Sequence, residues 1–288
     1  MNSRIILIDA LGVIYRSFYA IKALATSAGR PTNAVYGFIK TFAQIRRVWQ
    51  PTHVCVVFDG GLPEKRKKLL ETYKSQRPPM PDQLRLQLDD IREYLDAARL
   101  FNLRVEGQEA DDVLASIAVQ AADSGLETLV VSSDKDLLQI AGGKISLVAP
   151  GKIEDKIGPA EVKLKTGVLP EQIVEWLAMV GDSSDNIPGV PGIGAKTAAK
   201  LLGQWGSLGE ILANLERLDP EKTRRLLQEH RETVLRNVEL ITLDKRLPLS
   251  SRPEDMLVEL QDGARLQAFF KRLEFHSLAA ELDVKRAT

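Results

Sequence analysis

Cysteine and histidine are scarce in this chain of 288 residues, which holds one Cys and three His. Because Cys55 is the only cysteine, an intramolecular disulfide is excluded, and its place in the apolar run Val54–Phe58 indicates a buried strand residue. The histidines His53, His230 and His276 stand far apart in the sequence. Without a Cys/His cluster, no zinc site is expected.

Long apolar runs and net charge are also lacking. No stretch approaches the roughly 20 apolar residues that span a bilayer. Asp9 interrupts the first apolar run, so a signal peptide is not expected. We therefore expect a cytoplasmic protein. The 39 Lys and Arg residues balance 39 Asp and Glu residues. A neutral sum argues weakly against a nucleic-acid binder, because a dense cluster of acids can cancel a basic surface elsewhere.

Alternating strands and helices are predicted over the first two-thirds of the chain. The runs Ile5–Ile8, Val54–Phe58 and Leu129–Val131 are typical of parallel strands buried on both faces. Helical spacing of apolar residues marks the stretches between and beside them, Val35–Phe42, Leu84–Leu95 and Val113–Ala121. From about residue 159 only helical patterns follow. The sequence therefore predicts an α/β fold, with a mostly parallel central sheet flanked by helices over 1–160 and a helical subdomain over 161–288.

Acidic residues stand where the predicted strands end. They follow the three runs above and a short strand around 103–105, and they are Asp9, Asp59, Asp134, Asp136, Glu109, Asp111 and Asp112. The carboxyl ends of parallel strands share one edge of the sheet, so these side chains are expected to meet there. Taken singly, each acid has an ordinary explanation as a helix cap or a turn residue.

Converging carboxylates raise one another's pKa unless cations neutralise them. Oxygen ligands favour the hard ions Mg²⁺ or Mn²⁺. Asp182 and Asp185 add a pair three residues apart, a spacing that points both side chains the same way on a helical turn, although Asp185 alone could be an N-cap. Two ions about 3.5–4 Å apart could use these ligands to clamp the attacking and leaving oxygens of a phosphodiester.

A glycine-rich loop precedes a short helix at Gly189-Val-Pro-Gly-Ile-Gly-Ala-Lys-Thr. Gly192 and Gly194 free the backbone at the helix N-terminus, where N–H groups bind phosphate, and Lys196 and Lys200 add positive charge. A dinucleotide fingerprint is the competing interpretation, but its glycines must follow a strand, and here a proline-containing loop precedes them. A helix–hairpin–helix that binds the DNA backbone fits better.

A basic run lies between the second and third strands. It begins at Glu64-Lys-Arg-Lys-Lys and continues to Tyr73, Lys74 and Arg77. A charge run of this kind is usually a solvated helix face. Because it follows Asp59, these cations could instead draw a phosphate towards the acidic edge, while the ring of Tyr73 could stack on a base.

Four motifs carry a resemblance to a known family. They are Glu109-Ala-Asp-Asp-Val-Leu-Ala, Ser133-Asp-Lys-Asp-Leu, Gly181-Asp-Ser-Ser-Asp-Asn-Ile-Pro-Gly-Val and Gly192-Ile-Gly-Ala-Lys-Thr-Ala. With them the chain resembles, over nearly its whole length, the 5′–3′ exonuclease domain of bacterial DNA polymerase I and the related flap endonucleases. The resemblance implies a structure-specific 5′ nuclease that cleaves DNA near a junction of single and double strands.

The resemblance also implies roles for individual residues. One metal site would use Asp9, Asp59, Glu109 and Asp111, with Asp112 close by, and a second would use Asp134, Asp136, Asp182 and Asp185. A helical arch from about 60–95 would place Lys74 and Arg77 near the reacting phosphate, with Arg66 supporting. The helix–hairpin–helix, about 186–202, would hold the duplex backbone through Gly189, Gly192, Ile193, Gly194, Lys196, Thr197 and Lys200, often with a K⁺ ion.

Departures from the family pattern are Ala10-Leu11-Gly12 after the first acid, Gly60-Gly61 after the second, and Lys65 before the arch arginine. They concern substrate preference more than the proposed ligands. The expected partners are DNA with a 5′ flap or 5′ end and, functionally, a DNA polymerase and a ligase. We expect a nucleoid-associated monomer. The alternatives are a non-catalytic protein that binds branched DNA, an RNA-directed 5′ nuclease and a nucleotide-binding α/β enzyme.

Overall fold

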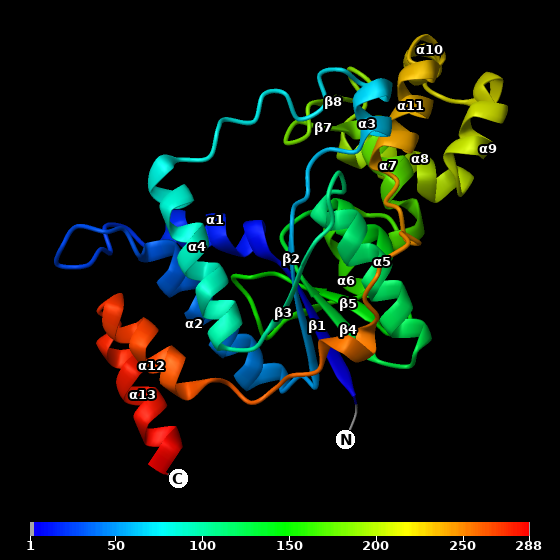
Figure 1. Cartoon of the computed structure of the whole chain (residues 1–288). Coiled ribbons are helices and arrows are strands. Elements are labelled where there is room, and N and C mark those ends of the chain that lie inside the picture. Colours follow the sequence, from blue (N-terminus) through cyan, green and yellow to red (C-terminus); the bar gives the residue numbers. More distant parts are fainter. Residues whose placement is uncertain (1–2, 288) are drawn as a thin grey trace.

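A six-stranded sheet forms the centre of the molecule in the computed structural model, which describes the backbone of residues 3–287 and the side chains of residues 3–282 (Figure 1). Its strands are β1 (Arg4–Asp9), β2 (His53–Phe58), β3 (Phe101–Arg104), β4 (Glu127–Val131), β5 (Ile145–Val148) and β6 (Lys156–Ile157). The spatial order is β3-β2-β1-β4-β5-β6, and only the pairing of β5 with β6 is antiparallel. The prediction of a mostly parallel α/β sheet is confirmed.

Both faces of the sheet are buried, which explains the unbroken apolar runs of its strands. Side chains alternate between the faces along a strand. In β1, Ile5 and Leu7 join one hydrophobic core, while Ile6 and Ile8 join a second core on the opposite face. Successive strands are added on one side of β1 as far as β3 and on its other side from β4 onward. Open α/β sheets bind ligands at such a switch point, at the carboxyl ends of the strands.

One face of the sheet is covered by helices from both ends of the chain. They are α1 (Ala10–Ala20), α2 (Asn33–Trp49), α4 (Asp82–Ala97), α12 (Gly263–Arg272) and α13 (His276–Ala287). The ring of Tyr94 on α4 lies 6.1 Å from that of Phe269 and 6.5 Å from that of Phe270, both on α12. These aromatic contacts hold α12, which lies within the segment 161–288 expected to form a helical subdomain, on the sheet half.

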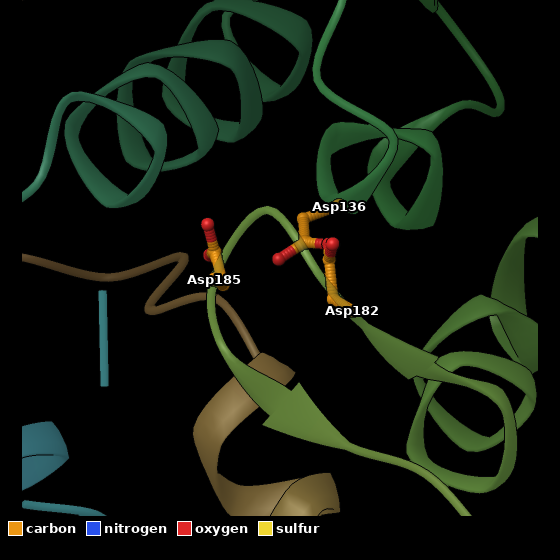
Figure 2. Close-up of side chains that lie close together, drawn as sticks. All are labelled: Asp136, Asp182 and Asp185. Atoms are coloured by element: carbon orange, nitrogen blue, oxygen red, sulfur yellow. The ribbon is translucent and has the colours of Figure 1, made fainter. Parts of the chain in front are cut away.

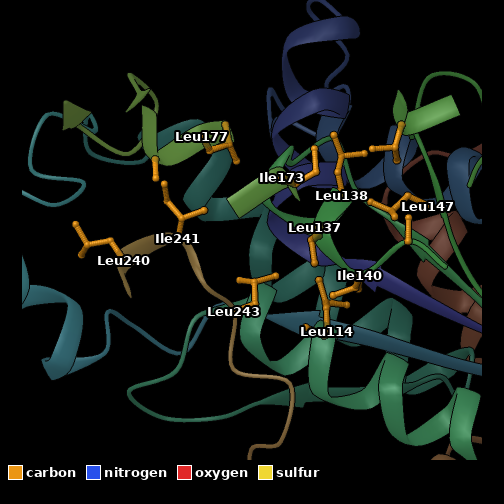
Figure 3. Close-up of a cluster of buried hydrophobic side chains, with 14 of the residues drawn as sticks. Leu114, Leu137, Leu138, Ile140, Leu147, Ile173, Leu177, Leu240, Ile241 and Leu243 are labelled. Atoms are coloured by element: carbon orange, nitrogen blue, oxygen red, sulfur yellow. The ribbon is translucent and has the colours of Figure 1, made fainter. Parts of the chain in front are cut away.

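The opposite face carries α5 (Ala110–Asp123), η1 (Asp136–Ile140) and the helical half of the chain. That half contains α6 (Pro159–Thr166), η2 (Pro170–Gln172), α7 (Ile173–Val180), α8 (Ala195–Trp205), α9 (Leu208–Ala213), η3 (Leu215–Arg217), α10 (Glu221–Glu229) and α11 (Arg231–Ile241). A short hairpin of β7 (Gly181–Asp182) and β8 (Ile187–Pro188) stands between α7 and α8. Leu114 of α5, Leu137 of η1 and Leu177 of α7 belong to one core that joins the two halves (Figure 3).

The segment expected to form a helical arch is helical only at its two ends. It begins with the short helix α3 (Glu64–Leu69), continues through turns over 71–76 and an irregular stretch to residue 81, and then enters α4. In Figure 1 this connection runs from beside α11 across the molecule to the other side. Pro78, Pro79 and Pro81 explain the break, because proline interrupts a helix and restricts the residue before it.

A long strap returns the chain from α11 to the sheet half. It includes the turn η4 (Pro253–Met256) and is anchored by backbone hydrogen bonds. Val258 N donates to Thr52 O at 2.9 Å, and Asp262 N donates to Ala97 O at 2.9 Å. The helical half is thus a middle segment of the chain, held at both its ends. Among the described residues, no helix is both long and apolar enough to cross a membrane.

Candidate active site

Asp9 stands at the carboxyl end of β1 and caps α1. Its Oδ1 accepts a hydrogen bond from Gly12 N at 3.0 Å, and its Oδ2 accepts one from Ser132 Oγ at 3.0 Å. The same hydroxyl oxygen accepts from Asp134 N at 3.1 Å. The ends of β1 and β4 are therefore linked through Ser132, which brings the first acid of the chain next to the loop that carries Asp134.

Asp59 and Glu109 are brought together by two neighbouring loops. Gly60 N donates to Gln108 O at 2.9 Å, and Gly107 N donates to Gly60 O at 2.9 Å. A Cβ at Gly60 would stand 1.7 Å from Val105 O, so this close approach requires glycine. Burial raises the pKa of Asp59, and the charge of Glu109 raises that pKa further.

Asp136, Asp182 and Asp185 form the tightest group of acids in the described part of the chain (Figure 2). One carboxylate oxygen from each lies within 4.8 Å of the others, and all three residues are buried. Asp182 is the last residue of β7 and Asp185 lies within the hairpin turn that follows it, so the pair does not occupy a helical turn as expected. Asp136 Oδ1 makes no hydrogen bond to any described residue although it is buried.

The remaining acids feel one another's charge. Burial and then the charges of Asp134 and Asp9 raise the pKa of Asp111 well above its usual value. Burial and the charges of Asp134 and Asp185 do the same to the pKa of Asp136. Burial also raises the pKa of Asp9 and of Asp134. The charges of Asp185 and Asp9 raise the pKa of Asp134 further, so Asp134 feels an acid from each of the two expected ligand groups.

Two cations from the turn after α3 compensate part of this charge. The buried Lys74 contacts Glu109 through its ammonium group and lies 3.4 Å from Asp185 Oδ2. Arg77 Nη2 donates to Asp185 Oδ1 at 2.7 Å, while half of its side chain remains exposed. Burial raises the pKa of Glu109, but the neighbouring Lys74 and Arg66 outweigh it and hold that pKa below its usual value.

The turn after α3 is clasped to the β7–β8 hairpin. Lys74 N donates to Asp185 O at 3.0 Å, and Gln76 Nε2 donates to Ser183 O at 2.9 Å. From the hairpin, Asn186 Nδ2 donates to Thr72 O at 2.7 Å. The arch segment is therefore fixed over the acidic group by the same hairpin that supplies two of the acids.

Three residues differ from their expected roles. Tyr73 is 5% exposed and its hydroxyl lies 3.2 Å from Asp185 Oδ2, so its ring is not available to stack on a base. Arg66 is buried with its guanidinium between Glu109 and Asp112, and is not turned towards a phosphate. Asp112 is held by that guanidinium instead of joining the cluster of acids.

Two residues of the site were not singled out from the sequence. Lys135 Nζ lies 2.9 Å from Asp182 Oδ1. Burial raises the pKa of Asp182, but hydrogen bonds from Ser184 and Lys135 outweigh it and lower that pKa. Gly12 leaves room for Asp9, since a Cβ there would stand 2.2 Å from Asp9 Oδ2. Lys135 stands between Asp134 and Asp136 in one motif, and this position could have indicated a site residue. Gly12 offered no such indication beyond its departure from the family pattern.

The glycine loop leads into an open helix N-terminus at α8. Gly192 has φ +88°, a conformation that favours glycine, and Gly194 is the N-cap residue. No described side chain caps this helix, and Gly194 and Lys196 are exposed, so first-turn N–H groups face outward. Ile193 is 3% exposed and belongs to the core, so only its backbone could contact DNA.

The other residues of this loop also have definite surroundings. Gly189 packs against the backbone of α7, because a Cβ there would stand 2.2 Å from Val180 O. Lys200 is exposed and Thr197 is partly exposed. Gly192, Lys196, Thr197 and Lys200 thus share one accessible region at the start of α8, where a phosphate backbone could lie.

A mostly parallel sheet with acids at its carboxyl edge and a helical half beside it defines the class of α/β nucleases with an acidic centre. Residues 4–167 match the model of the 5′-3′ exonuclease N-terminal resolvase-like domain, and residues 168–264 match that of the 5′-3′ exonuclease C-terminal SAM fold. The chain belongs to the 5′–3′ exonuclease family.

Relatives agree with this assignment. The chain is 36% identical over 278 residues to the 5′-3′ exonuclease of Aquifex aeolicus, covering 96% of this chain and 94% of that protein. It is 40% identical over 292 residues to the thermostable DNA polymerase I of Thermus thermophilus, covering 99% of this chain and 34% of the polymerase. The chain therefore spans about a third of the length of the polymerase relatives that it matches.

Solved structures share the fold. T5 5′-exonuclease with bound divalent metal ions (zinc) superposes with a TM-score of 0.71 at 22% identity, covering 84% of this chain and 90% of that one. The catalytic core of Rad2 in complex with DNA substrate superposes with a TM-score of 0.67 at 14% identity, covering 99% and 92%. At these identities the likeness concerns the fold alone.

Proposed function

We propose that the chain is a structure-specific 5′ nuclease that hydrolyses DNA phosphodiesters at 5′ ends and 5′ flaps, using two Mg²⁺ or Mn²⁺ ions, in DNA replication and repair. The single observation that carries this proposal is the convergence of buried acids around Asp136, Asp182 and Asp185 at the carboxyl edge of the sheet. The family membership of the chain and the metal-containing and DNA-containing neighbours in fold support it.

The donor set suits hard divalent ions. All the converging side-chain donors are carboxylate oxygens, and the buried Asp136 Oδ1 has no hydrogen bond to a described residue that would compete with an ion. One group of ligands would be Asp9, Asp59, Glu109 and Asp111, and the other would be Asp134, Asp136, Asp182 and Asp185. When bound, the ions would neutralise charge that develops on the phosphoryl group and lower the pKa of water near it.

Residues of the clasped turn would orient the scissile phosphate. Lys74 holds its ammonium group among the acids, where it can balance charge on a phosphate oxygen. Arg77 lies at the rim with half of its side chain exposed and can donate two parallel hydrogen bonds to a phosphate. The start of α8, with Lys196 and Lys200, would bind the duplex backbone, and a K⁺ ion in the loop 189–194 would assist it.

The proposed setting follows from this substrate. We propose a monomer that works near the nucleoid in the cytoplasm, on DNA ends that a polymerase creates and a ligase later seals. A K⁺ site would appear as tighter DNA binding in K⁺ than in Na⁺ at equal ionic strength. Equal affinity in the two salts would remove K⁺ from the proposal without touching the nuclease activity.

The decisive experiment is cleavage of a labelled 5′-flap duplex, mapped to single nucleotides, with Mg²⁺ and with EDTA. We expect cleavage near the junction with Mg²⁺ only. Asp134→Ala should lose cleavage by about a thousandfold or more while DNA affinity changes little. The exposed Asp123→Ala at the end of α5 is the matched control and should cleave like the wild type.

The outcomes separate the proposal from its rivals. A fully active Asp134→Ala protein, or cleavage that persists in EDTA, would contradict the two-metal scheme. Binding to flap DNA without any cleavage would instead favour a non-catalytic protein that recognises branched DNA. Faster cleavage of a matched RNA flap would favour an RNA-directed 5′ nuclease.

A further inference from the structure

The guanidinium of Arg66 connects the acidic centre with the end of α11. It donates from Nη1 to Glu109 Oε2 at 2.5 Å and to Asp112 Oδ2 at 2.5 Å, and from Nη2 to Asp112 Oδ1 at 2.9 Å. Its Nε donates to Leu240 O at 2.9 Å, and Nη2 donates to Thr242 O at 3.2 Å. The side chain is nearly buried. A residue expected to support the reacting phosphate is thus fully engaged inside the protein.

Asp112 has no oxygen turned towards the cluster of acids. Both of its oxygens bind the guanidinium, and Oδ1 also accepts from Asp244 N at 2.8 Å. The guanidinium of Arg66 bonds to Asp112 and not to Asp111, the preceding residue of α5, whose pKa is raised by burial and by the charges of Asp134 and Asp9. Successive residues of a helix point about 100° apart. The first turn of α5 therefore directs one aspartate to the acidic centre and the next to Arg66.

We propose that Arg66 and Asp112 are positioning residues, which fix the Glu109 carboxylate in the acidic centre and tie it to the segment that leaves α11. Asp112 is not a ligand of the divalent ions, and Arg66 does not contact the scissile phosphate. The bidentate pair holds the planar guanidinium in one orientation. That orientation places one guanidinium nitrogen on Glu109 Oε2, while the ammonium group of Lys74 contacts Oε1.

This inference rests on the proposed function, because Glu109 is one of its ligands. Arg66 also donates to the carbonyls of Leu240 and Thr242 at the end of α11, so it links Glu109 to the helical half. Turning Arg66 towards a phosphate would break these bonds and leave the buried Asp112 carboxylate without its cation, while Glu109 would keep only Lys74, which is strongly unfavourable. The same argument opposes a metal ion on Asp112.

The test compares three near-isosteric variants. Asp112→Asn keeps the shape of the side chain and weakens the pair with Arg66, whereas Asp111→Asn removes a proposed ligand. The matched control is Asp90→Asn, because Asp90 is 2% exposed and is bound by Arg30 and Arg272 on the far side of the sheet. Measurements are the number of Mn²⁺ ions bound, by electron paramagnetic resonance, the kcat and KM of flap cleavage, and Tm.

We expect Asp112→Asn and Asp90→Asn to lower Tm by roughly 5–10 °C each, because both weaken the ion pairs of a buried aspartate. Asp112→Asn should bind as many Mn²⁺ ions at saturation as the wild type, yet lose about 10–100-fold in kcat with KM little changed. Asp90→Asn should keep the wild-type kcat. Asp111→Asn should bind fewer ions. Arg66→Lys keeps the charge but not the planar fork, and should not restore kcat.

Several results would overturn the proposal. Loss of an ion in Asp112→Asn would make that residue a ligand. A wild-type kcat in Asp112→Asn would make the pair merely structural, as at Asp90. An Arg66→Lys variant with normal kcat but weaker, more salt-sensitive DNA binding would make Arg66 a phosphate contact. If the wild-type chain does not cleave at all, the proposed function fails, while the count of Mn²⁺ ions still decides the role of Asp112.

Discussion

Gly12 shows how a residue without a side chain shapes the acidic centre. Its N–H donates to Asp9 Oδ1 at 3.0 Å, and a Cβ at this position would stand 2.2 Å from Asp9 Oδ2. The neighbour in this contact is a short side chain that is itself held by Ser132. Asp9 could give way only by leaving its place beside Ser132.

We therefore expect Gly12→Ala to weaken Mn²⁺ binding about 10-fold or more, because the Asp9 carboxylate must move, and to lower the rate of flap cleavage with it. Isothermal titration of the variant with Mn²⁺ measures the change. Gly203→Ala in α8 is the control, since a Cβ there meets no atom within 4 Å. Equal Mn²⁺ affinity in both variants would show that Asp9 tolerates the displacement.

The raised pKa values of the acids predict a pH-dependent affinity for metal ions. Burial and neighbouring acids raise the pKa of Asp111 and of Asp136 well above the usual value near 3.9. In the metal-free protein these groups keep protons at a pH where exposed aspartates have lost them, and a divalent ion must displace those protons. Affinity for Mn²⁺ should therefore rise with pH above the usual value.

Proton release is the direct measurement of this competition. Titration with Mn²⁺ in two buffers of different ionisation enthalpy should give different heats, and the difference should shrink as pH rises. The stability of the metal-free protein should change with pH in the opposite direction to its affinity for Mn²⁺. Because the folded chain holds these protons more tightly than the unfolded chain does, the metal-free protein should lose stability as pH rises through the raised pKa values. Identical heats in both buffers at every pH tested would contradict the assignment.

At the residue scale, the sequence predicted the place of the acids better than the direction of the cations. Asp9 and Asp59 could be placed because an acid directly after a parallel strand must lie at the carboxyl edge. The orientation of Arg66 and Tyr73 depends on contacts with Glu109 and with the carbonyl of Leu240, far away in the sequence. No local pattern specifies such contacts, so their burial could not be predicted.

At the element scale, unbroken apolar runs identified β1, β2 and β4 because both faces of these strands are buried. The hairpin of β7 and β8 escaped prediction, since each strand has two residues and carries no periodicity. The helix α12 falls within the helical patterns predicted after residue 159, but the sequence did not indicate what it packs against. Only the packing of Phe269 and Phe270 against Tyr94 places it on the sheet half.

The open start of α8 predicts a salt-dependent effect. Lys196 and Lys200 are exposed beside the uncapped N-terminus and have no ion-pair partner among the described residues. The double variant Lys196→Ala/Lys200→Ala should bind flap DNA less tightly. The slope of log affinity against log salt should fall by about 1 for each phosphate that a lysine no longer neutralises. Binding titrations at four salt concentrations measure it.

The matched control for this pair is Lys67→Ala/Lys68→Ala, which removes two exposed lysines of another helix, α3. This control should reduce the slope of log affinity against log salt less than the Lys196→Ala/Lys200→Ala variant does. The kcat at saturating DNA should stay near the wild-type value in the α8 variant, because neither lysine contacts the acids. An unchanged salt slope in that variant would place the duplex elsewhere.

At the scale of the whole molecule, one hydrophobic core runs from the sheet into the helical half. Leu114 and Leu147 from the sheet half, and Leu177 and Ile241 from the helical half, belong to it (Figure 3). The acids come from both halves as well. The two halves are therefore expected to unfold together, and a bound ion should stabilise them jointly.

Calorimetry tests this coupling. With Mg²⁺ at about a hundredfold over its dissociation constant, one site adds about 2.7 kcal/mol to the free energy of unfolding. For a chain of this size that should raise Tm by roughly 5–10 °C, within a single transition. Two transitions, of which only one moves with Mg²⁺, would show that the halves are independent. NaCl at equal ionic strength separates site binding from a general salt effect.

The neutral total charge also acquires a meaning at this scale. The 39 acidic residues match 39 basic ones, yet a dense group of acids is gathered at one edge of the sheet. Exposed cations such as Lys196 and Lys200 are consequently left for other surfaces. The sum of charges could not predict this separation, since only the fold decides which charges meet.

The strap that returns from α11 has a mechanical consequence. A segment joined to its support at one point can swing about that point, whereas a segment joined at two points can only rock between them. The helical half leaves the sheet after β6 and comes back where Val258 N bonds to Thr52 O. A duplex pulling on α8 would thus load both attachments at once, and one of them begins at the carbonyls of Leu240 and Thr242 that Arg66 binds.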